Sequence, residues 1–444
     1  MTTLKRVAPH ALDLARSVRK AVLGPIVDAR LYARAKAQAR QPRRPLAEER
    51  PLHIAFLCSA WDQQHYGITV WTRVLAAALV RLGHRVVVFR RARHEQADTV
   101  DSDGVRIVTV TGQPLRGWPA LPPIWPWLAD WQRAVTAAVL ARDAADPFDV
   151  VSGPIWPAEP LALMRAAAVP LAVSLHTTEA IASALDGRGS PEDRALVEAE
   201  RALFAGAPVL IANSEATLLD LAKAFGVVVP SDRAVVVPHG MPDRAATPRE
   251  RPATEEPLIL FLGQLGFRKG IDVFLDALPA VLCGRPATVA IAGAPQGESP
   301  EAAFRARHAG APWAGRVRFL GLVDDATKQA LLAAASVVAV PSRYESFGLV
   351  SVEAMMHGVA VVASRAGGIP EVVEDGVTGL LVPPGDSEAL AAAIGRILDD
   401  ASLRQAMGKA ARARYLAHFT DTRMATAWLA AIRSAEARMT STGQ

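Results

Sequence analysis

The sequence predicts an α/β protein of two domains, each built on a doubly wound parallel sheet. Its 444 residues are too many for one ordinary domain and enough for two sizeable cores. Short apolar runs alternate with segments of helical periodicity, and this strand, helix, strand order is typical of parallel sheets with right-handed crossovers. A charged, proline-containing segment at residues 243–257 separates two such series. We therefore expect ligands at the carboxyl ends of the strands of both sheets.

Composition and charge narrow the class of protein. The chain is 51% hydrophobic and 21% charged, and no apolar run approaches the 18 or so residues that a membrane-spanning helix needs. Cys58 and Cys283 lie far apart, so we expect no disulfide framework and a reducing cytoplasm. Residues 1–50 hold 12 Lys or Arg and 4 Asp or Glu, a charge of +8, against −3 for the rest. The excess of basic residues thus lies in an N-terminal arm and not in the body of the protein, which argues against a nucleic-acid-binding core.

The first 45 residues are predicted to form a basic amphipathic arm. Apolar side chains recur from Leu4 to Val22 at three- and four-residue spacing, and basic residues lie largely off that stripe. The basic residues recur too often for a signal peptide. Two interpretations remain open: the arm lies on an anionic membrane surface, or its apolar stripe packs on the body of the protein. The polar, proline-rich residues 38–51 are predicted to be a linker.

The first domain is predicted to begin at Leu52 with a buried strand. The loop that follows contains one glycine, Gly67, whereas a dinucleotide fingerprint needs three closely spaced glycines, so a dehydrogenase is disfavoured. A later strand ends at His176. A lone histidine is usually structural, yet one at the carboxyl end of a buried strand points toward the ligand edge of the sheet.

Four tryptophans cluster among prolines between Gly117 and Trp131. We interpret them as one loop with two possible roles. It is either a lid of large side chains over the first sheet, or an aromatic surface for a sugar ring or lipid headgroups. The tryptophans are Trp118, Trp125, Trp127 and Trp131.

The second domain is predicted to open with a strand followed by a loop that carries Arg268 and Lys269. Two adjacent cations between a strand and a helix are suited to bind phosphate. Lys acts as a point charge, and the Arg guanidinium can donate two parallel hydrogen bonds. Further on, Asp386 is expected to cap a helix.

An anion site is predicted in the stretch from Ala339 to Glu371. A short apolar run is followed by a loop and then by a helix that ends before Gly358. Backbone N–H groups at the start of that helix have no intrahelical partner and lie at the positive end of its dipole, so a diphosphate could bind there. These groups belong to Gly348, Leu349 and Val350, with Ser346 and Phe347 just before them.

Glu345 and Glu353 bracket this anion site. Beside bound phosphates, carboxylates are suited to accept hydrogen bonds from sugar hydroxyls, Glu353 from a ribose diol and Glu345 from the hexose. Glu345 could also face positive charge that develops on the sugar. The alternative is that both are solvated charges at a helix start, where acidic side chains are favourable.

The two glutamates seven residues apart, followed by Gly367, Gly368 and Glu371, resemble the donor site of family 4 of the retaining glycosyltransferases, which have the GT-B fold. The resemblance covers about residues 52–435. It implies that the Gly67 loop faces the donor phosphates and the acceptor, that His176 approaches the transferred sugar, and that backbone groups near Leu322 hold the nucleobase. The Lys269-Gly270 pair matches the family. Gln264 departs from it, because the family has an arginine there.

The resemblance implies a retaining α-glycosyltransferase that moves a hexose from a nucleotide-sugar to a hydroxyl of a glycan or lipid-linked acceptor. Glu345, His176 and Lys269 are the candidate catalytic residues, and the donor-binding set is Gly67, Arg268, Lys269, Leu322, Phe347, Gly348, Leu349, Val350 and Glu353. No metal or other cofactor is expected, because cations and helix amides can stabilise the leaving diphosphate. Localisation is expected to be cytoplasmic, with possible peripheral membrane contact. The alternatives are a non-catalytic partner subunit of the same fold and another GT-B enzyme such as a nucleotide-sugar epimerase.

These expectations divide the chain into five parts. Residues 1–51 are the arm and linker, 52–242 the acceptor domain and 243–257 the domain linker. Residues 258–415 form the nucleotide-sugar domain, and 416–444 form terminal helices that cross back to the first domain.

Overall fold

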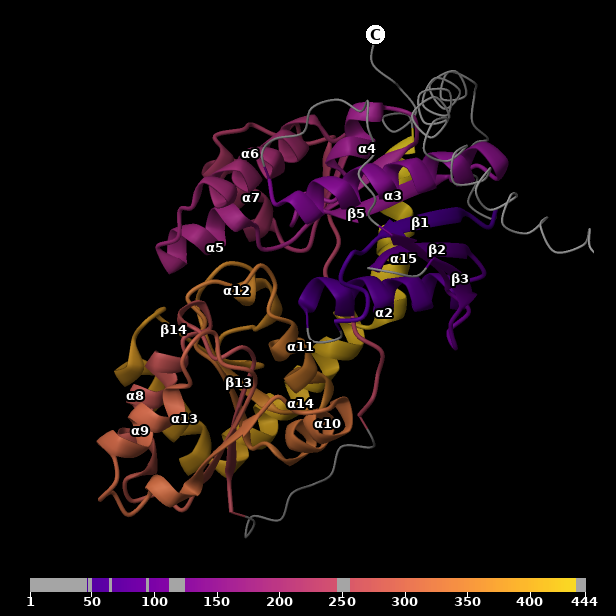
Figure 1. Ribbon diagram of the computed structural model, residues 1–444. Helices are drawn as coiled ribbons and strands as arrows, with labels where there is room; N and C mark the ends of the chain where they lie inside the picture. Colours follow the sequence, from indigo (N-terminus) through magenta and orange to yellow (C-terminus); the bar gives the residue numbers. More distant parts are fainter. Residues whose placement is uncertain are drawn as a thin grey trace, which may run out of the picture. The chain divides into compact units, whose positions relative to one another are not determined.

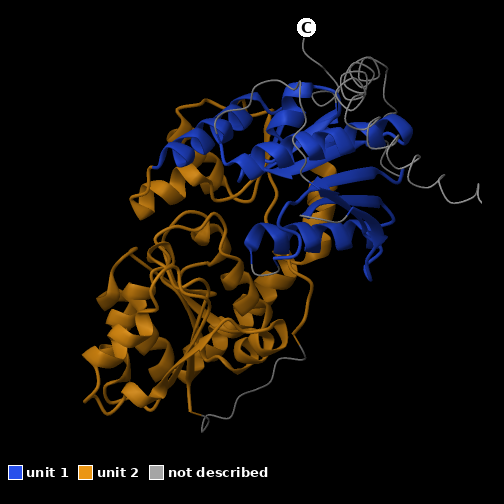
Figure 2. Ribbon diagram, viewed as in Figure 1, with its two compact units in different colours: residues 1–174, 190–210, 432–444 blue, residues 175–189, 211–431 orange. Residues whose placement is uncertain are grey.

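The computed structural model describes residue 46 and residues 50–63, 66–92, 96–111, 124–245 and 256–436. The chain divides into two compact units that are interleaved in sequence (Figure 2). The first unit takes residues 1–174, 190–210 and 432–444, and the second takes 175–189 and 211–431. The predicted arm over residues 1–45, Trp118 and residues 246–255 of the predicted linker lie outside the described part.

An eight-stranded sheet forms from the first half of the chain, in the order β3-β4-β2-β1-β5-β6-β7-β8 (Figure 1). β1 pairs in parallel with β2 and β5, while β3 joins β4 as an antiparallel edge. The strands are β1 (His53–Leu57), β2 (Arg85–Ala92), β3 (Ala97–Val100), β4 (Arg106–Thr111), β5 (Val150–Pro154), β6 (Leu171–Leu175), β7 (Val209–Ala212) and β8 (Ala234–Val236). The helices are α2 (Gly67–Arg81), α3 (Pro126–Ala145), α4 (Leu161–Ala166), α5 (Glu179–Asp186), α6 (Pro191–Gly206) and α7 (Glu215–Phe225).

The second sheet has six parallel strands in the order β11-β10-β9-β12-β13-β14. Numbered from its own first strand this is 3-2-1-4-5-6, the doubly wound order, in which ligands bind where the winding reverses. The strands are β9 (Leu258–Leu262), β10 (Thr288–Ala292), β11 (Val317–Gly321), β12 (Val337–Val340), β13 (Ala360–Ser364) and β14 (Gly379–Val382). The reversal lies between β9 and β12.

Helices cover both faces of the second sheet, with α8 and α13 on one face and α11 and α14 on the other (Figure 1). The helical segments are η1 (Phe267–Lys269), α8 (Ile271–Leu282), α9 (Pro300–Arg307), η2 (Ala314–Arg316), α10 (Asp325–Ala334), α11 (Leu349–Met356), α12 (Ile369–Val372), α13 (Ser387–Asp399), α14 (Ala401–His418) and α15 (Asp421–Ser434). Apolar side chains such as Phe274, Leu278 and Ile394 are fully buried between α8, α13 and the sheet. The predicted cap is confirmed, because the Asp386 side chain accepts a hydrogen bond from the Ala389 amide at the start of α13.

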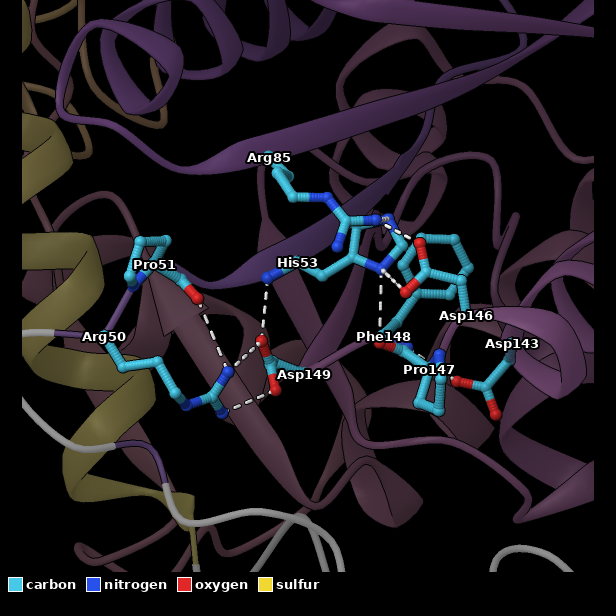
Figure 3. Close-up of polar contacts among 9 residues, drawn as sticks. All are labelled: Arg50, Pro51, His53, Arg85, Asp143, Asp146, Pro147, Phe148 and Asp149. Atoms are coloured by element: carbon cyan, nitrogen blue, oxygen red, sulfur yellow. Dashed lines mark hydrogen bonds and ion pairs between the residues drawn. The ribbon is translucent and has the colours of Figure 1, made fainter.

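Polar contacts fix the chain where it enters β1 (Figure 3). The Arg50 guanidinium donates two hydrogen bonds to the Asp149 carboxylate, at 3.0 and 2.7 Å, and the His53 amide donates to the same carboxylate at 2.7 Å. Beside them the Asp146 carboxylate pairs with Arg85 and lies 3.6 Å from Nδ1 of His53. Burial lowers the pKa of His53, which favours its neutral form. These contacts lie at the amino end of β1, away from the carboxyl end where ligands are expected.

The interpretation of the tryptophans as one loop is wrong for Trp127 and Trp131, which belong to α3. Trp131 is fully buried and its indole N–H donates to Glu159 at 3.1 Å. Pro126, at the first helical position, starts the helix that contains them, because proline is favoured there. Trp125 and Trp127 stack with their ring centroids 5.9 Å apart.

The prediction of two doubly wound α/β sheets is confirmed. Among the described helices none combines the length and apolar character needed to cross a bilayer.

Candidate active site

Two loops meet where the winding of the second sheet reverses. β9 and β12 are parallel neighbours, so the loops that follow them leave the sheet side by side at its carboxyl edge. The loop after β9 contains η1, and Gly270 ends it with φ +69. A Cβ on Gly270 would lie 2.0 Å from the Pro341 carbonyl oxygen, so only glycine lets these loops approach so closely. Arg343 strengthens the junction, since its amide donates to the Arg268 carbonyl at 2.8 Å.

The side chains of Lys269 and Glu345 form an ion pair across this junction. Glu345 is 8% exposed, and the Ser342 hydroxyl donates to the same carboxylate oxygen at 3.0 Å. Burial alone would raise the pKa of the Glu345 carboxyl, but the charges of Lys269 and Arg268 outweigh burial and lower it. Burial also lowers the pKa of Lys269. The carboxylate of Glu345 is therefore ionised at neutral pH and held in place.

Arg268, next to this pair, is partly exposed, and its guanidinium makes no hydrogen bond or ion pair with any side chain that the structure describes. Together Lys269, Arg268 and Glu345 carry a net charge of +1 at neutral pH. Gln264, in the same loop, is exposed. A site of this charge suits an anion better than a neutral molecule.

The amino end of α11 adds hydrogen-bond donors to the same region. Within the described part of the chain, the amides of Gly348, Leu349 and Val350 donate to no backbone or side-chain acceptor, as expected for the first turn of a helix. The Ser351 hydroxyl in that turn is also without a partner among the described residues, although Ser351 is fully buried. Buried polar groups are rarely left unpaired, so these donors are consistent with an anionic ligand at this helix end.

The loop before α11 is held rigidly by its neighbours. The Ser346 carbonyl accepts hydrogen bonds from the hydroxyls of Ser214 and Thr217, both at 2.7 Å. The Gly368 amide donates to the Glu345 carbonyl at 2.9 Å. Gly367 has φ +51, and a Cβ there would lie 2.1 Å from that same carbonyl oxygen. The two glycines are therefore required by close backbone packing around Glu345.

His176 follows directly after β6 and is 4% exposed. Its ring centroid lies 5.5 Å from that of His239, and the His239 ring lies 5.0 Å from that of Phe347. Burial lowers the pKa of His176 to about 3 and lowers that of His239 well below its usual value. Both imidazoles are therefore neutral at pH 7. The His239 ring lies between His176 and Phe347, which belongs to the loop that carries Glu345.

Glu353 lies on α11 and is 6% exposed. Its Oε1 atom is 2.7 Å from Nζ of Lys328 on α10. Leu322, in the loop before α10, is 63% exposed. Both predicted glutamates thus have a lysine partner, which argues against the interpretation that they are simply solvated charges.

The second unit therefore contains every predicted site residue except Gly67, which is the first residue of α2 in the first unit. The structure brings together Lys269, Glu345 and the start of α11, and separately pairs Glu353 with a residue that the sequence did not single out. The residues missed were Lys328, Ser342, His239 and the pair Ser214 and Thr217. His239 follows a strand, as His176 does, and the same argument from its position could have found it. Nothing local marks Lys328.

The sequence is similar to those of known proteins. The family described as glycosyltransferase family 4 matches residues 66–244, and the family described as glycosyl transferases group 1 matches residues 256–400. A D-inositol 3-phosphate glycosyltransferase of Kineococcus radiotolerans is 34% identical over 392 residues, which cover 78% of this chain and 86% of that protein. The chain belongs to glycosyltransferase family 4.

Solved structures of similar fold agree with this assignment. A sucrose-phosphate synthase from Thermosynechococcus elongatus superposes with a TM-score of 0.70 at 25% identity, covering 84% of this chain and 96% of that one. HepE of Anabaena, solved with UDP and glucose, gives a TM-score of 0.62 at 23% identity, covering 84% and 97%. The fold is GT-B, as expected, and this member of the family is a hexosyltransferase enzyme.

Proposed function

We propose that this enzyme transfers a hexose from a nucleotide-sugar to a hydroxyl acceptor and retains the anomeric configuration of the donor. One observation carries the proposal. Lys269 pairs with the buried carboxylate of Glu345 beside Arg268, and the loop that carries Glu345 leads into the unbonded amides at the start of α11, at the ligand edge of the second sheet. This is the arrangement that departure of a diphosphate from a sugar requires, with donors for the leaving group and an anion for the sugar.

The donor diphosphate is proposed to bind at the start of α11. The amides of Gly348, Leu349 and Val350 would donate to its oxygens, and Arg268 would reach it as a fork. Lys269 would lie between the diphosphate and Glu345. In this role Lys269 stabilises charge that grows on the leaving phosphate, so no divalent ion is needed for that step in our proposal.

In the transfer step the bond between the anomeric carbon and the β-phosphate oxygen breaks, and its electron pair leaves with the diphosphate. Glu345 faces the positive charge that develops on the sugar. The acceptor hydroxyl forms its new bond from the same face, and its proton passes to the departing phosphate oxygen. Attack on that face retains the configuration. His176, neutral at pH 7, is proposed to donate a hydrogen bond to the transferred sugar.

The remaining contacts are proposed from the resemblance to the family. Glu353 would accept hydrogen bonds from the ribose diol, and backbone groups near Leu322 would hold the base. The acceptor is proposed to be a glycan or a lipid-linked molecule. D-inositol 3-phosphate is a further candidate to test, because relatives carry that name. We also propose that the basic arm over residues 1–45 brings the enzyme to an anionic membrane surface.

A binding screen followed by product analysis tests the proposal. UDP, GDP, ADP and their hexose derivatives are added to the purified protein during thermal unfolding. A ligand at 100 times its Kd should stabilise by about 2.7 kcal/mol. The donor that binds is then incubated with and without acceptors, in buffer with and without EDTA, and the anomeric proton of the product is assigned by NMR.

We expect one nucleoside diphosphate and its sugar to stabilise the protein, and the product to be the α-glycoside with EDTA present. No stabilisation by any nucleotide would contradict the donor site. A β-glycoside from an α-linked donor would contradict retention, and an epimerised sugar formed without acceptor would indicate an epimerase.

A further inference from the structure

We propose that Lys328 is a positioning residue for Glu353, holding its carboxylate in the orientation in which it can accept hydrogen bonds from the ribose of the donor nucleotide. The inference rests on the proposed function and deepens it, because it adds a residue that determines how the nucleotide is recognised. Lys328 lies in the first turn of α10 and Glu353 in the second turn of α11, and Figure 1 shows these helices next to each other.

The contacts leave one side of the Glu353 carboxylate available. Lys328 Nζ lies 2.7 Å from Oε1. Oε2 accepts no hydrogen bond from any residue in the described part of the chain. A carboxylate can accept several hydrogen bonds, so a diol can use Oε2 while Lys328 retains Oε1. Glu353 is 6% exposed, and burial of a carboxylate is unfavourable unless a charged or hydrogen-bonding partner offsets its lost hydration.

Lys328 is itself held in place. Its Nζ atom lies 3.1 Å from an oxygen of Asp325, one turn earlier on α10, and Asp325 in turn pairs with Arg244. The four charges alternate along the row Arg244, Asp325, Lys328, Glu353. Burial would lower the pKa of Lys328, but the carboxylates of Glu353 and Asp325 outweigh burial and raise it. The ammonium group is therefore charged and has a fixed position relative to Glu353.

A purely structural role would be to tie α10 to α11. That role predicts a lower melting temperature for a Lys328 variant, with every ligand affected alike. Positioning of Glu353 predicts a selective effect, because only ligands that carry the ribose hydroxyls should lose affinity. The two roles are separated by comparing a nucleotide with its deoxyribose forms.

The experiment measures Kd by titration calorimetry for whichever of UDP, GDP and ADP binds most tightly, and for its 2′-deoxy and 3′-deoxy forms. In the wild type, at least one deoxy form should bind on the order of tenfold more weakly, the loss expected for one hydrogen bond to a charged group. Lys328→Met should reduce that ratio to within about threefold of one. Lys328→Arg, which keeps the charge, should preserve the ratio, and Asp325→Asn should give an intermediate value.

Glu353→Gln is the matched control. If it reduces the ratio while Lys328→Met leaves it unchanged, the inference is wrong and the ribose role of Glu353 stands. Equal weakening of all ligands by Lys328→Met also overturns it, since that is the structural role alone. If Glu353→Gln keeps the wild-type ratio, the ribose contact in the proposed function is wrong and the inference falls with it. Absence of binding by all three nucleotides contradicts the donor site itself.

Discussion

Lys269 and Glu345 form an ion pair in the candidate active site before a donor binds. Lys269→Ala removes a cation from the proposed diphosphate site and also leaves Glu345 buried without its lysine partner. We expect kcat/KM for the donor to fall by on the order of 10² to 10³, the loss typical when one preorganised donor to a developing oxyanion is removed. Steady-state kinetics with the natural donor measures it.

Ser342→Ala is the matched control for Lys269, because it removes only one hydrogen bond to Glu345 and no charge. Ser342→Ala should lower kcat/KM for the donor by less than about tenfold. Gln264→Arg restores the cation that the family has at this position and should tighten diphosphate binding. If Lys269→Ala has the same kinetic constants as the wild type, the phosphate site must lie elsewhere.

The neutral state of His176 makes the fold sensitive to acid. Its pKa is lowered from 6.5 to about 3 by burial, so folding favours the deprotonated form. This contribution to stability is fully present above pH 6.5 and is lost as the pH falls toward 3, at about 1.4 kcal/mol per pH unit. The difference in unfolding free energy between wild type and His176→Asn should therefore shrink by that amount per unit between pH 6 and 4. Urea denaturation at several pH values measures it, and a difference that does not vary with pH would contradict the shift.

Local patterns could identify the residues at strand and helix ends, and these include most of the site. Arg268, Lys269 and Gly348 are found this way, because a loop after a buried strand and the first turn of a helix are recognisable from sequence. The partners of the glutamates are not, since Lys328 and Glu353 are 25 residues apart on different helices. Such pairs depend on how two helices pack, which no local pattern records.

At the scale of elements, Glu371 in the short helix α12 anchors the start of α7. Its two carboxylate oxygens accept hydrogen bonds from the amides of Glu215 and Ala216 in the first turn of α7, both at 2.9 Å. Glu371→Ala should lower the unfolding free energy by about 1–3 kcal/mol, because it removes both acceptors from a helix end. Glu371→Gln should cost less. Urea denaturation measures both.

Glu374→Ala is the control for Glu371. Glu374 is an exposed carboxylate 3.6 Å from Arg414, and surface pairs of this kind contribute little. Its effect should stay within about 0.5 kcal/mol. Equal losses in the two alanine variants would show that the contact with α7 does not matter for stability.

The prediction for the tryptophans was wrong because it relied on the high proline content around them. The tryptophans were assigned to a loop because prolines surround them, but Pro126 starts α3 and leaves Trp131 inside the core. Proline is favoured in the first turn of a helix, although it breaks a helix when it lies in the interior. Strands and helices with clear periodicity, such as β9, α8 and α13, were recognisable from sequence.

At the scale of the whole molecule, the two sheets have the same strand order once the antiparallel edge strand β3 and the edge strand β8 are set aside, and in each a loop at the reversal carries a buried carboxylate. In the second sheet this is Glu345. In the first sheet Glu159, which follows β5, accepts hydrogen bonds from the amide and hydroxyl of Ser59, which follows β1. Two doubly wound sheets could be predicted because the alternation of apolar runs and helical periodicity can be recognised in a single sequence. The division into domains at residues 243–257 stays a prediction.

The basic arm is predicted to determine location and not chemistry, because its charge is separate in sequence from every candidate site residue. Deletion of residues 1–45 should leave turnover of a soluble acceptor nearly unchanged and reduce pelleting with anionic vesicles. Reversal of Arg16, Arg19 and Lys20 to glutamate should have the same effect on pelleting. Unchanged pelleting in both variants would favour an arm packed on the protein body.

Glu345 and Glu353 have separate roles in the proposed donor site. The decisive measurement is kcat, donor KM and nucleoside diphosphate Kd for Glu345→Gln and Glu353→Gln, determined side by side. Glu353→Gln should mainly raise the donor KM and weaken diphosphate binding, because ribose contacts are made equally before and during reaction. Glu345→Gln should mainly lower kcat and leave the affinity for the nucleoside diphosphate, which lacks the hexose, almost unchanged. Loss of diphosphate affinity in Glu345→Gln with kcat retained, or wild-type behaviour of both variants, would contradict the assigned donor site.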